Sequence, residues 1–278
     1  MKTWLITGCS SGLGQGIAKA VLRRGDWAAV TARDPASLGP LAQAYPERIL
    51  PLRLDLNDSA SMEQAVRETC QRFGPIDVLV NNAGHGYRAA IGESAPEAVE
   101  ELFQTNFFGP MELTRLVLPQ MRARRSGLIV NVTSIGAVRG ALGNGYYSAA
   151  KGALELASEA LAKEVTHLGI RVMLAEPGAL RTGFYGARLG SSALTIPDYD
   201  ALAAQYRRGP QTDRHDQPGD PDRAGELIVE TALRSDAPFR LLLGSDAVQT
   251  AVETLENRLL EARSWAEVSD QSDFCTQS

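Results

Sequence analysis

The chain has 278 residues, of which 44% are hydrophobic and 22% are charged. These fractions are typical of a globular protein and exclude a disordered one. The length suits one large α/β domain with a sizeable core. With 28 lysines and arginines against 33 acidic residues, the formal net charge is −5, so no basic field favours binding to nucleic acid.

The cysteines and histidines lie far apart in the sequence, so neither a disulfide framework nor a metal site is predicted. No apolar run approaches the roughly 18 residues that a membrane-spanning helix needs. The apolar stretch at the start is too short for a signal peptide. We therefore expect a cytoplasmic protein that uses no metal and does not enter a membrane.

Short apolar runs alternate with longer segments of helical periodicity. The predicted strands cover residues 3–7, 27–32, 49–54, 76–80, 128–133, 170–175 and 239–243. Helical patterns between them include residues 59–73, 98–121, 147–167 and 222–233. Because the strands are apolar throughout rather than alternating, we expect helices on both faces of their sheet. The sequence therefore predicts a single Rossmann-type, doubly wound α/β domain with about seven parallel strands.

Two segments depart from this alternation. Residues 183–220 are rich in glycine and proline, and a connection of this length in a compact domain is usually functional or mobile. We interpret them as a lid over the substrate, with some helix around residues 199–207; a tolerated surface insertion is the alternative. Residues 264–278 are polar and are expected to form a frayed tail or an arm at an interface.

The first predicted strand leads directly into a glycine loop, Thr-Gly-Cys-Ser-Ser-Gly-Leu-Gly at residues 7–14, which an amphipathic helix follows. Glycines allow the tight turn and let the backbone approach a pyrophosphate closely. The start of the helix presents unpaired N–H groups and the positive end of its dipole to the phosphates. We therefore predict a dinucleotide site formed by Gly8, Ser10, Ser11, Gly12, Leu13 and Gly14.

This loop and several later motifs resemble those of the short-chain dehydrogenase/reductase family. In chain order, the further motifs are Asn-Asn-Ala-Gly at residues 81–84, Asn106, Ser134, Tyr-Ser-Ala-Ala-Lys at 147–151 and Pro177-Gly178. Within the family, the segments at residues 31–33 and 176–182 are similar to the hydroxysteroid and retinol dehydrogenase branch. The resemblance implies hydride transfer between a nicotinamide cofactor and a carbonyl–alcohol pair, by a homodimer or homotetramer.

The end of the second strand indicates NADP rather than NAD. Ala32 stands where NAD-using relatives carry an aspartate, and the guanidinium of Arg33, which follows it, suits a 2′-phosphate. A charge-assisted hydrogen bond of this kind contributes roughly 1.5–3 kcal/mol. Asp34 leaves an alternative open, because its carboxylate either holds the ribose or caps the next segment before Pro35.

The resemblance implies further contacts with the adenine and with the phosphates. Asp55 contacts the adenine amino group and Leu56 lends its backbone, although Asp55 also fits a residue that leads into the next helix. After the fourth strand, Asn82 and Gly84, with Ala83 between them, form a turn on the cofactor side, whereas Asn81 is expected to stabilise the sheet.

The segment after the sixth strand is expected to lie under the nicotinamide. The resemblance implies that Pro177 and Gly178 form the turn beneath the ring and that Thr182 binds its carboxamide, with the backbone around Leu180 as a further contact. Because such contacts orient the ring, they decide which of its faces reacts.

Tyr147 and Lys151 are four residues apart in a predicted helix, so that both side chains emerge on one face. A free phenol has a pKa near 10 and carries protons poorly at neutral pH. The ammonium of Lys151 and an oxidised nicotinamide both stabilise the phenolate. We therefore predict that Tyr147 is the general acid/base that protonates the carbonyl oxygen. Tyr146 lies off this face.

Two further polar residues are predicted to complete the catalytic group. Ser134, thirteen residues before the tyrosine, is expected to donate to the substrate oxygen, with Thr133 as the alternative hydroxyl. Pro110 is expected to disturb the helix at residues 98–121. The resemblance implies that Asn106 in this helix completes a tetrad and holds a water that links Lys151 to solvent.

We therefore predict an NADP-dependent oxidoreductase acting on a fairly apolar ketone or aldehyde, with NAD the less favoured cofactor. Two alternatives remain open: a non-catalytic NADP-binding sensor or scaffold, and an epimerase or dehydratase of the same fold. Four side chains are expected to flank the substrate pocket, and plain packing or exposure without substrate contact is the alternative for each: His85, Tyr87, Phe184 and Tyr185.

Overall fold

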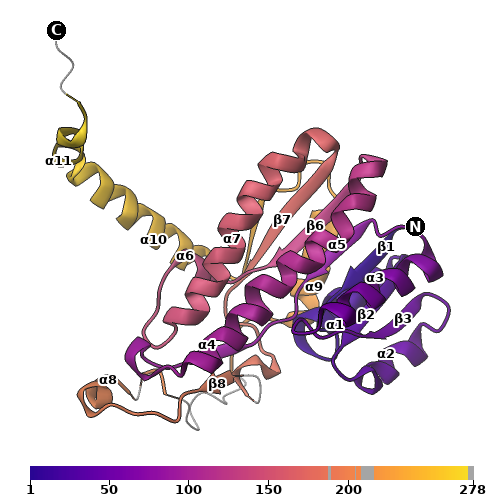
Figure 1. Cartoon of the computed structure of the whole chain (residues 1–278), viewed down its shortest axis with the longest axis horizontal. Coiled ribbons are helices and arrows are strands. Elements are labelled where there is room, and N and C mark those ends of the chain that lie inside the picture. Colours follow the sequence, from indigo (N-terminus) through magenta and orange to yellow (C-terminus); the bar gives the residue numbers. More distant parts are fainter. Residues whose placement is uncertain (187–188, 204, 208–215, 275–278) are drawn as a thin grey trace.

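The structure is a computed structural model, and it describes residues 1–186, 189–203, 205–207 and 216–274. A parallel sheet of seven strands, in the order β3-β2-β1-β4-β6-β7-β9, forms its centre (Figure 1). Each predicted strand is present, and its bounds agree within two residues. The strands are β1 (Thr3–Ile6), β2 (Trp27–Ala32), β3 (Ile49–Arg53), β4 (Val78–Asn81), β6 (Gly127–Val132), β7 (Ile170–Pro177) and β9 (Arg240–Leu243).

Helices cover both faces of this sheet, which confirms the predicted doubly wound fold. Successive side chains of β1 point to opposite faces, so that Trp4 and Ile6 enter one core and Leu5 the other. The first core is closed by α1 (Gly12–Arg23), α2 (Gly39–Ala44) and α9 (Pro221–Ala232). The second is closed by α3 (Ser59–Phe73), α5 (Gly109–Arg124) and α7 (Gly145–Val165).

Helices α1 and α9 touch backbone to backbone. A Cβ atom added at Gly16 would lie 2.4 Å from the carbonyl oxygen of Pro221, and one added at Gly225 would lie 2.4 Å from the carbonyl carbon of Gly16. A side chain at either position would separate the helices. Glycines therefore set the close packing that holds α1 behind the glycine loop.

The predicted helix at residues 98–121 is interrupted, as expected from Pro110. It consists of α4 (Pro96–Phe103), a wide π-helical turn (Gln104–Phe108) and α5. Pro110 has no N–H to donate to the carbonyl of Asn106, so the regular hydrogen-bond ladder breaks here. The π-helical turn places Asn106 in the interior, where it is fully buried.

A second, two-stranded parallel sheet lies apart from the main one. It consists of β5 (Gly86–Arg88) and β8 (Leu189–Ser191), and neither strand was predicted. Beyond β8, the predicted helix at residues 199–207 is shorter: a 3₁₀ turn (Pro197–Tyr199) leads into α8 (Asp200–Ala203). Parts of the predicted lid, residues 187–188, 204 and 208–215, lie outside the described residues.

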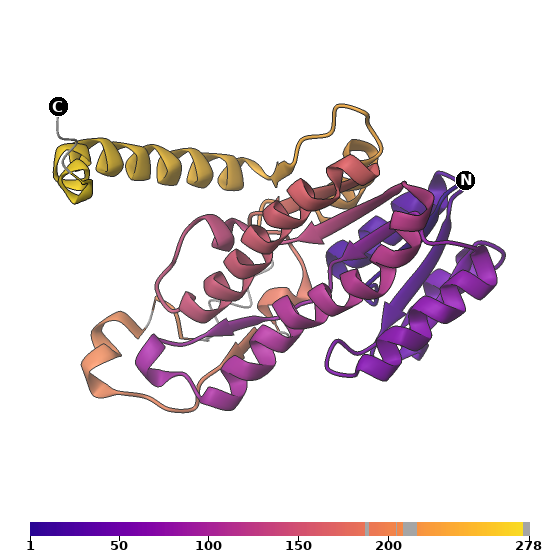
Figure 2. The ribbon, with the colours of Figure 1, turned by 45° about the horizontal axis from the view of Figure 1, so that its top comes forward.

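Helix α10 (Ser245–Ser264) begins against the body and then runs away from it, ending in the short α11 (Ala266–Ser269) (Figure 2). The predicted polar tail thus contains helix in its described part. Among the described residues, no helix is both long and apolar enough to cross a membrane. The outer part of α10 exposes apolar side chains: Val248, Val252, Leu255, Leu259 and Leu260.

Candidate active site

A cavity of about 380 Å³ opens where the carboxyl ends of the central strands meet. The order of the strands reverses between β1 and β4, and ligands of open α/β sheets bind at such a switch point. The cavity brings together most of the predicted site: Gly8, Ser11, Gly12, Leu13, Gly14, Asn82, Ala83, Gly84, Asn106, Ser134, Tyr147, Lys151, Pro177, Gly178, Leu180 and Thr182.

The glycine loop joins β1 to α1 and forms one wall of this cavity. Gly8 and Gly12 have positive φ angles of 73° and 61°, which other residues adopt with strain. A Cβ at Gly14 would lie 2.3 Å from the carbonyl oxygen of Gly8. The N-cap residue Ser11 makes no side-chain hydrogen bond to the first turn of α1, and this turn contains no acidic residue. Its backbone N–H groups therefore remain available to an anion, as a dinucleotide phosphate requires.

The turn after β4 is bound directly to the glycine loop. The side-chain amide of Asn82 donates to the carbonyl oxygens of Thr7 (2.8 Å) and Gly8 (3.2 Å). The Thr7 hydroxyl accepts hydrogen bonds from the backbone N–H groups of Asn82 and Ala83, each at 2.9 Å. Asn82 thus shapes the loop. As predicted, Asn81 serves the sheet, because its amide donates to the side chain of Asn131 at 2.8 Å.

The predicted acid/base pair lies at the start of α7, buried under the cavity. Tyr147 and Lys151 are 8% and 4% exposed. The Lys151 ammonium donates to the carbonyl oxygen of Val132 at 2.9 Å, and burial lowers its pKa to about 8. Burial raises the pKa of Tyr147 to about 12, against the hydrogen bond with Ser134 and the charge of Arg88, which lower it. The phenol is therefore protonated at neutral pH and suited to donate.

The predicted stabilisation of the phenolate by Lys151 and an oxidised nicotinamide stays a prediction. Among the described residues, the groups that lower the pKa of Tyr147 are Ser134 and Arg88, and Lys151 is not one of them. With a pKa of about 8, Lys151 is still mostly charged at neutral pH and can act on the phenolate.

Ser134 caps the short helix α6 (Ile135–Val138), and its Oγ accepts the N–H of Gly136 at 3.0 Å. Its hydroxyl proton is left for the phenol oxygen of Tyr147, whose pKa this hydrogen bond lowers, or for a substrate oxygen beside it. Thr133, the alternative, is buried, and its hydroxyl lies 3.4 Å from the carbonyl oxygen of Ala175 in the sheet. The geometry favours Ser134 over Thr133 as the residue that faces a substrate.

Asn106 enters the cavity from the π-helical turn. Its amide nitrogen donates to the carbonyl oxygens of Leu102 (3.0 Å) and His85 (3.1 Å). Its buried Oδ1 has no hydrogen-bond partner among the described residues. A Cβ at Gly84 would lie 2.5 Å from this oxygen and 3.4 Å from the Lys151 ammonium. The bare glycine thus leaves room for a small polar group, such as water, to join them.

The segment after β7 closes the cavity from below. Asp246, in the first turn of α10, accepts the N–H of Ala179 at 2.7 Å, and a Cβ at Gly178 would lie 2.4 Å from its carboxylate. Thr182 accepts the N–H of Phe184 at 3.2 Å, which leaves its hydroxyl proton free. Only a glycine at position 178 allows this tight contact between β7 and α10.

Four predicted cofactor residues, Ser10, Arg33, Asp55 and Leu56, do not line the cavity. Arg33 is exposed at the end of β2 and forms no ion pair with any described residue. Asp34 accepts the N–H of Ala36 at 3.0 Å and caps a 3₁₀ turn, which favours the capping alternative. The Asp55 carboxylate accepts the N–H and side-chain amide of Asn57, each at 3.0 Å.

The rim opposite the glycine loop is aromatic. Phe184 and Tyr185 line the cavity as predicted, and the Phe184 ring meets Tyr147 edge to face, with ring centroids 5.7 Å apart. His85 and Tyr87 do not line it; Tyr87 instead packs in a small buried cluster with Tyr147. Five polar or charged lining residues were not predicted from the sequence: Arg88, Arg139, Asn144, Asp246 and Thr250.

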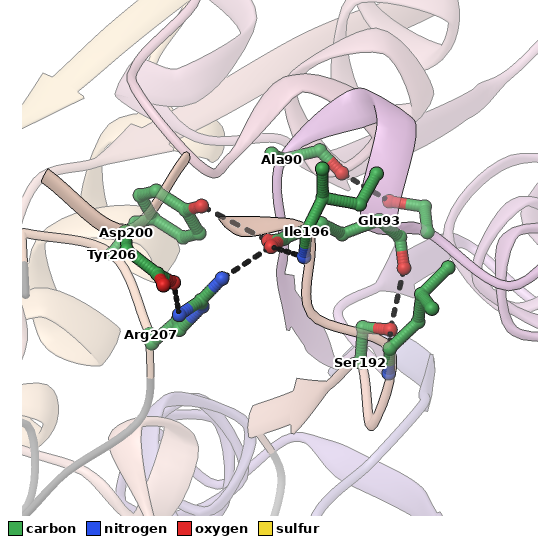
Figure 3. A network of polar contacts seen from close by, with 9 residues as sticks. Ala90, Glu93, Ser192, Ile196, Asp200, Tyr206 and Arg207 are labelled. Carbon is green, nitrogen blue, oxygen red and sulfur yellow. Dashed lines mark hydrogen bonds and ion pairs between the residues drawn. The ribbon is translucent and has the colours of Figure 1, made fainter. Parts of the chain in front are cut away.

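The segment beyond this rim is anchored on one buried carboxylate, that of Glu93 (Figure 3). It accepts hydrogen bonds from the N–H of Ile196 and the hydroxyl of Tyr206, each at 2.9 Å, and forms an ion pair with Arg207. The Ile196 N–H and the charge of Arg207 help to hold the pKa of Glu93 down at about 2. Arg207 also binds Asp200 at 2.8 Å.

The comparisons with known proteins agree with this geometry. The family model described as short chain dehydrogenase matches residues 2–189. "Oxidoreductase BOA17" of Botryotinia fuckeliana is 34% identical over 269 residues, which cover 96% of this chain and 98% of that protein. The crystal structure of a short-chain dehydrogenase from Streptomyces avermitilis is 40% identical, covers 98% of each chain and superposes with a TM-score of 0.90.

The chain belongs to the short-chain dehydrogenase family. It is a nicotinamide-dependent oxidoreductase that acts on alcohol and carbonyl groups. The predicted likeness to hydroxysteroid dehydrogenases is also confirmed: "17-beta-hydroxysteroid dehydrogenase type 1" of Mus musculus is 34% identical over 247 residues, which cover 84% of this chain and 71% of that protein.

Proposed function

We propose that the protein is an NADP-dependent oxidoreductase that interconverts a fairly apolar ketone or aldehyde and its alcohol. The observation that carries the proposal is the group formed by the buried Tyr147 and Lys151 and the partly buried Ser134, which shares one cavity with the glycine loop. Apolar side chains line part of the same cavity, among them Ile135, Leu180 and Phe184, and favour an apolar substrate.

Each residue of this group has one task in the proposed reaction. Tyr147 donates its phenolic proton to the carbonyl oxygen, and Ser134 donates a second hydrogen bond that holds this oxygen beside the phenol. Lys151 and Asn106 pass a replacement proton inward through the small space beside Gly84. A bound nicotinamide supplies the hydride for reduction and accepts it in oxidation.

The glycine loop fits a dinucleotide, since its close backbone contacts leave no room for side chains and the uncapped start of α1 faces the cavity. Gly8, Ser10, Ser11, Gly12, Leu13 and Gly14 would hold the pyrophosphate. Asn82, Ala83 and Gly84 would flank it, and Asp55 and Leu56 would meet the adenine. Pro177, Gly178, Leu180 and Thr182 would hold the nicotinamide.

The decisive test of catalysis replaces the phenol by a ring of the same size. Tyr147→Phe should lower kcat for ketone reduction by about 10²–10⁴-fold. NADPH binding, followed by its fluorescence, should remain within a few-fold of wild type because the phenyl ring still fills its place. A variant that retains most of its turnover would remove the assignment of Tyr147.

Arg33 supports the choice of NADP over NAD. Its guanidinium is exposed and forms no ion pair with the described residues, while the neighbouring Asp34 is occupied as a cap. Arg33→Ala should therefore raise KM for NADPH by roughly tenfold to a hundredfold and leave KM for NADH nearly unchanged. NADH is the internal control, and equal effects on both cofactors would contradict the assignment.

We also propose a lid, an oligomer and a cytoplasmic location. Both ends of residues 183–220 are joined, because the N–H of Arg181 donates to the carbonyl of Gly219 at 2.8 Å, as expected of a lid with paired hinges.

The exposed apolar side of α10 supports a homodimer or homotetramer, with the tail near residues 264–278 as part of its interface. The free thiols of Cys9 and Cys70 are compatible with the reducing cytoplasm, whereas Cys275 lies outside the described residues.

A further inference from the structure

Arg88 is held on the wall of the cavity by strand pairing on β5. Its backbone lies opposite Ser191 of β8, so the strand cannot turn the side chain elsewhere without breaking the small sheet. The preceding residue, Tyr87, is buried in the cluster behind the cavity. Because neighbouring side chains of a strand point to opposite faces, Arg88 points to the cavity, and it is among the residues that line it.

The charge of Arg88 is not balanced by the protein. Four charged residues line the cavity: Arg88, Arg139, Lys151 and Asp246. The one carboxylate, Asp246, already accepts the N–H of Ala179, and Lys151 donates to Val132. Within the described ranges, the guanidinium of Arg88 makes no hydrogen bond or ion pair. Arg139 is equally unpaired but is exposed to water at the rim, whereas Arg88 is partly buried.

The guanidinium also lies close to the reacting centre. Its charge lowers the pKa of Tyr147 and that of Tyr185. A group bound to Arg88 would therefore belong to the same molecule whose carbonyl oxygen faces Tyr147. The rings of Phe184 and Tyr185, whose centroids are 5.5 Å apart, line the same cavity, and an ionic contact beside such apolar groups is stronger than one in open water.

We propose that Arg88 binds an anionic group of the carbonyl substrate, a carboxylate or a phosphate monoester, and so selects acidic ketones or aldehydes over neutral ones. The proposal rests on the function proposed above and refines it: the substrate is apolar around its carbonyl and carries an oxyanion at one end. A guanidinium suits this task, because its planar fork donates two parallel hydrogen bonds to a carboxylate or phosphate.

The wild-type enzyme provides the first test. With NADPH, kcat/KM is measured for levulinate and for its neutral methyl ester, which differ in the charge and one methyl group, and for dihydroxyacetone phosphate and dihydroxyacetone. We expect at least one acid to exceed its neutral partner by more than tenfold, and the better pair tells whether the anion is a carboxylate or a phosphate. Equal rates within each pair overturn the proposal.

Variants at position 88 then test whether Arg88 causes the preference for acidic over neutral ketones. Arg88→Met should abolish this preference, so that the ratio of kcat/KM for levulinate to that for methyl levulinate falls by more than tenfold, and NADPH binding shows that the variant folds. Arg88→Lys should keep part of the preference. The matched control is Arg122→Met, an exposed arginine in the last turn of α5, which should change neither rate. A preference that survives Arg88→Met overturns the assignment to this residue.

The same data separate this proposal from the function on which it rests. If wild type reduces the neutral ketones and shows no acid preference, Arg88 is not the anion site but the oxidoreductase assignment stands. If wild type binds NADPH but turns over none of the ketones, or if Tyr147→Phe keeps the wild-type rate, the proposed function fails, and the proposal for Arg88 fails with it.

Discussion

The two walls of the cavity are built by different means. The cofactor wall is held by backbone: the glycine loop, the turn after β4 and the segment after β7 approach so closely that Gly14 and Gly178 have no room for a Cβ. The substrate wall, by which we mean the segment at residues 189–207 behind the aromatic rim, is held by side chains whose contacts converge on the carboxylate of Glu93. One wall thus depends on the absence of side chains, and the other depends on a single charged group.

This difference predicts how each wall fails. A backbone contact has no alternative conformation of similar energy, so a change there disrupts the whole wall. The side chains around Glu93 include Arg207, which is 29% exposed, and such groups can exchange a lost partner for water. A substitution in the cofactor wall is therefore expected to abolish most of the cofactor binding. A substitution in the substrate wall is expected to weaken substrate binding only in part.

The largest effect is expected from Gly14→Ala. The added methyl group would lie 2.3 Å from both the Gly8 carbonyl and the Asn82 amide, so the loop must open. NADPH affinity, measured by fluorescence titration, should fall by about a hundredfold or more, equivalent to roughly 3 kcal/mol. Gly152→Ala in α7 is the control, because its Cβ would meet only one atom, at 3.8 Å. Tight binding by Gly14→Ala would contradict a rigid wall.

Glu93→Gln should have an intermediate effect. The amide keeps the shape of the side chain but loses the ion pair with Arg207, so KM for the ketone should rise several-fold while NADPH binding is unchanged. Steady-state kinetics check the first expectation, and fluorescence the second. Glu97→Gln, at an exposed position in the first turn of α4, should alter neither. An equal loss of cofactor affinity would show that the two walls are not independent.

The pH dependence of this anchor has a defined sign. The pKa of Glu93 is about 2 in the folded protein, below its ordinary value of 4.5. Its contribution to stability is therefore complete above pH 4.5 and is lost as the pH falls toward 2. Limited proteolysis of residues 189–207 should be constant from pH 5 to 8 and increase only in acid; in Glu93→Gln it should be faster already at pH 7.

The smallest effect on catalysis is expected from the outer part of α10. The double variant Leu255→Glu and Leu259→Glu places charges on exposed apolar positions, so the stability of the single subunit should change by less than about 0.5 kcal/mol for each. The sedimentation coefficient should decrease if this side of α10 is covered in the oligomer. Charge changes at the exposed Glu256 and Glu261 provide a control on the same helix. An unchanged sedimentation coefficient of the double variant would show that this side of α10 is not part of the interface.

The cofactor wall could be predicted from the sequence because its requirements are local. Only glycine fits the positive φ angles at Gly8 and Gly12, and the spacing of Tyr147 and Lys151 follows from one turn of helix. The predicted strands and their parallel order followed from apolar runs that are continuous rather than alternating. The π-helical turn at Asn106 was foreseen only as a disturbance near Pro110.

The substrate wall could not be predicted, because its contacts join distant residues without a local pattern. Glu93 and Arg207 are 114 positions apart, and the strands β5 and β8 have three residues each, too few to show a period. Nothing in the sequence distinguishes Arg88 from a surface arginine, because its strand β5 depends on pairing with the distant β8. Helix α10 did carry a signal, since Val248, Val252, Leu255 and Leu259 recur at steps of three and four residues.

The first turns of α10 belong to the cavity, where Asp246 and Thr250 form part of its lining, and the same unbroken helix continues to Ser264. Its 20 residues measure about 30 Å at 1.5 Å per residue. The far end of this rod stands away from the rest of the subunit (Figures 1 and 2). A dye attached there would therefore report on the contacts of the rod with a second subunit rather than on events in the cavity.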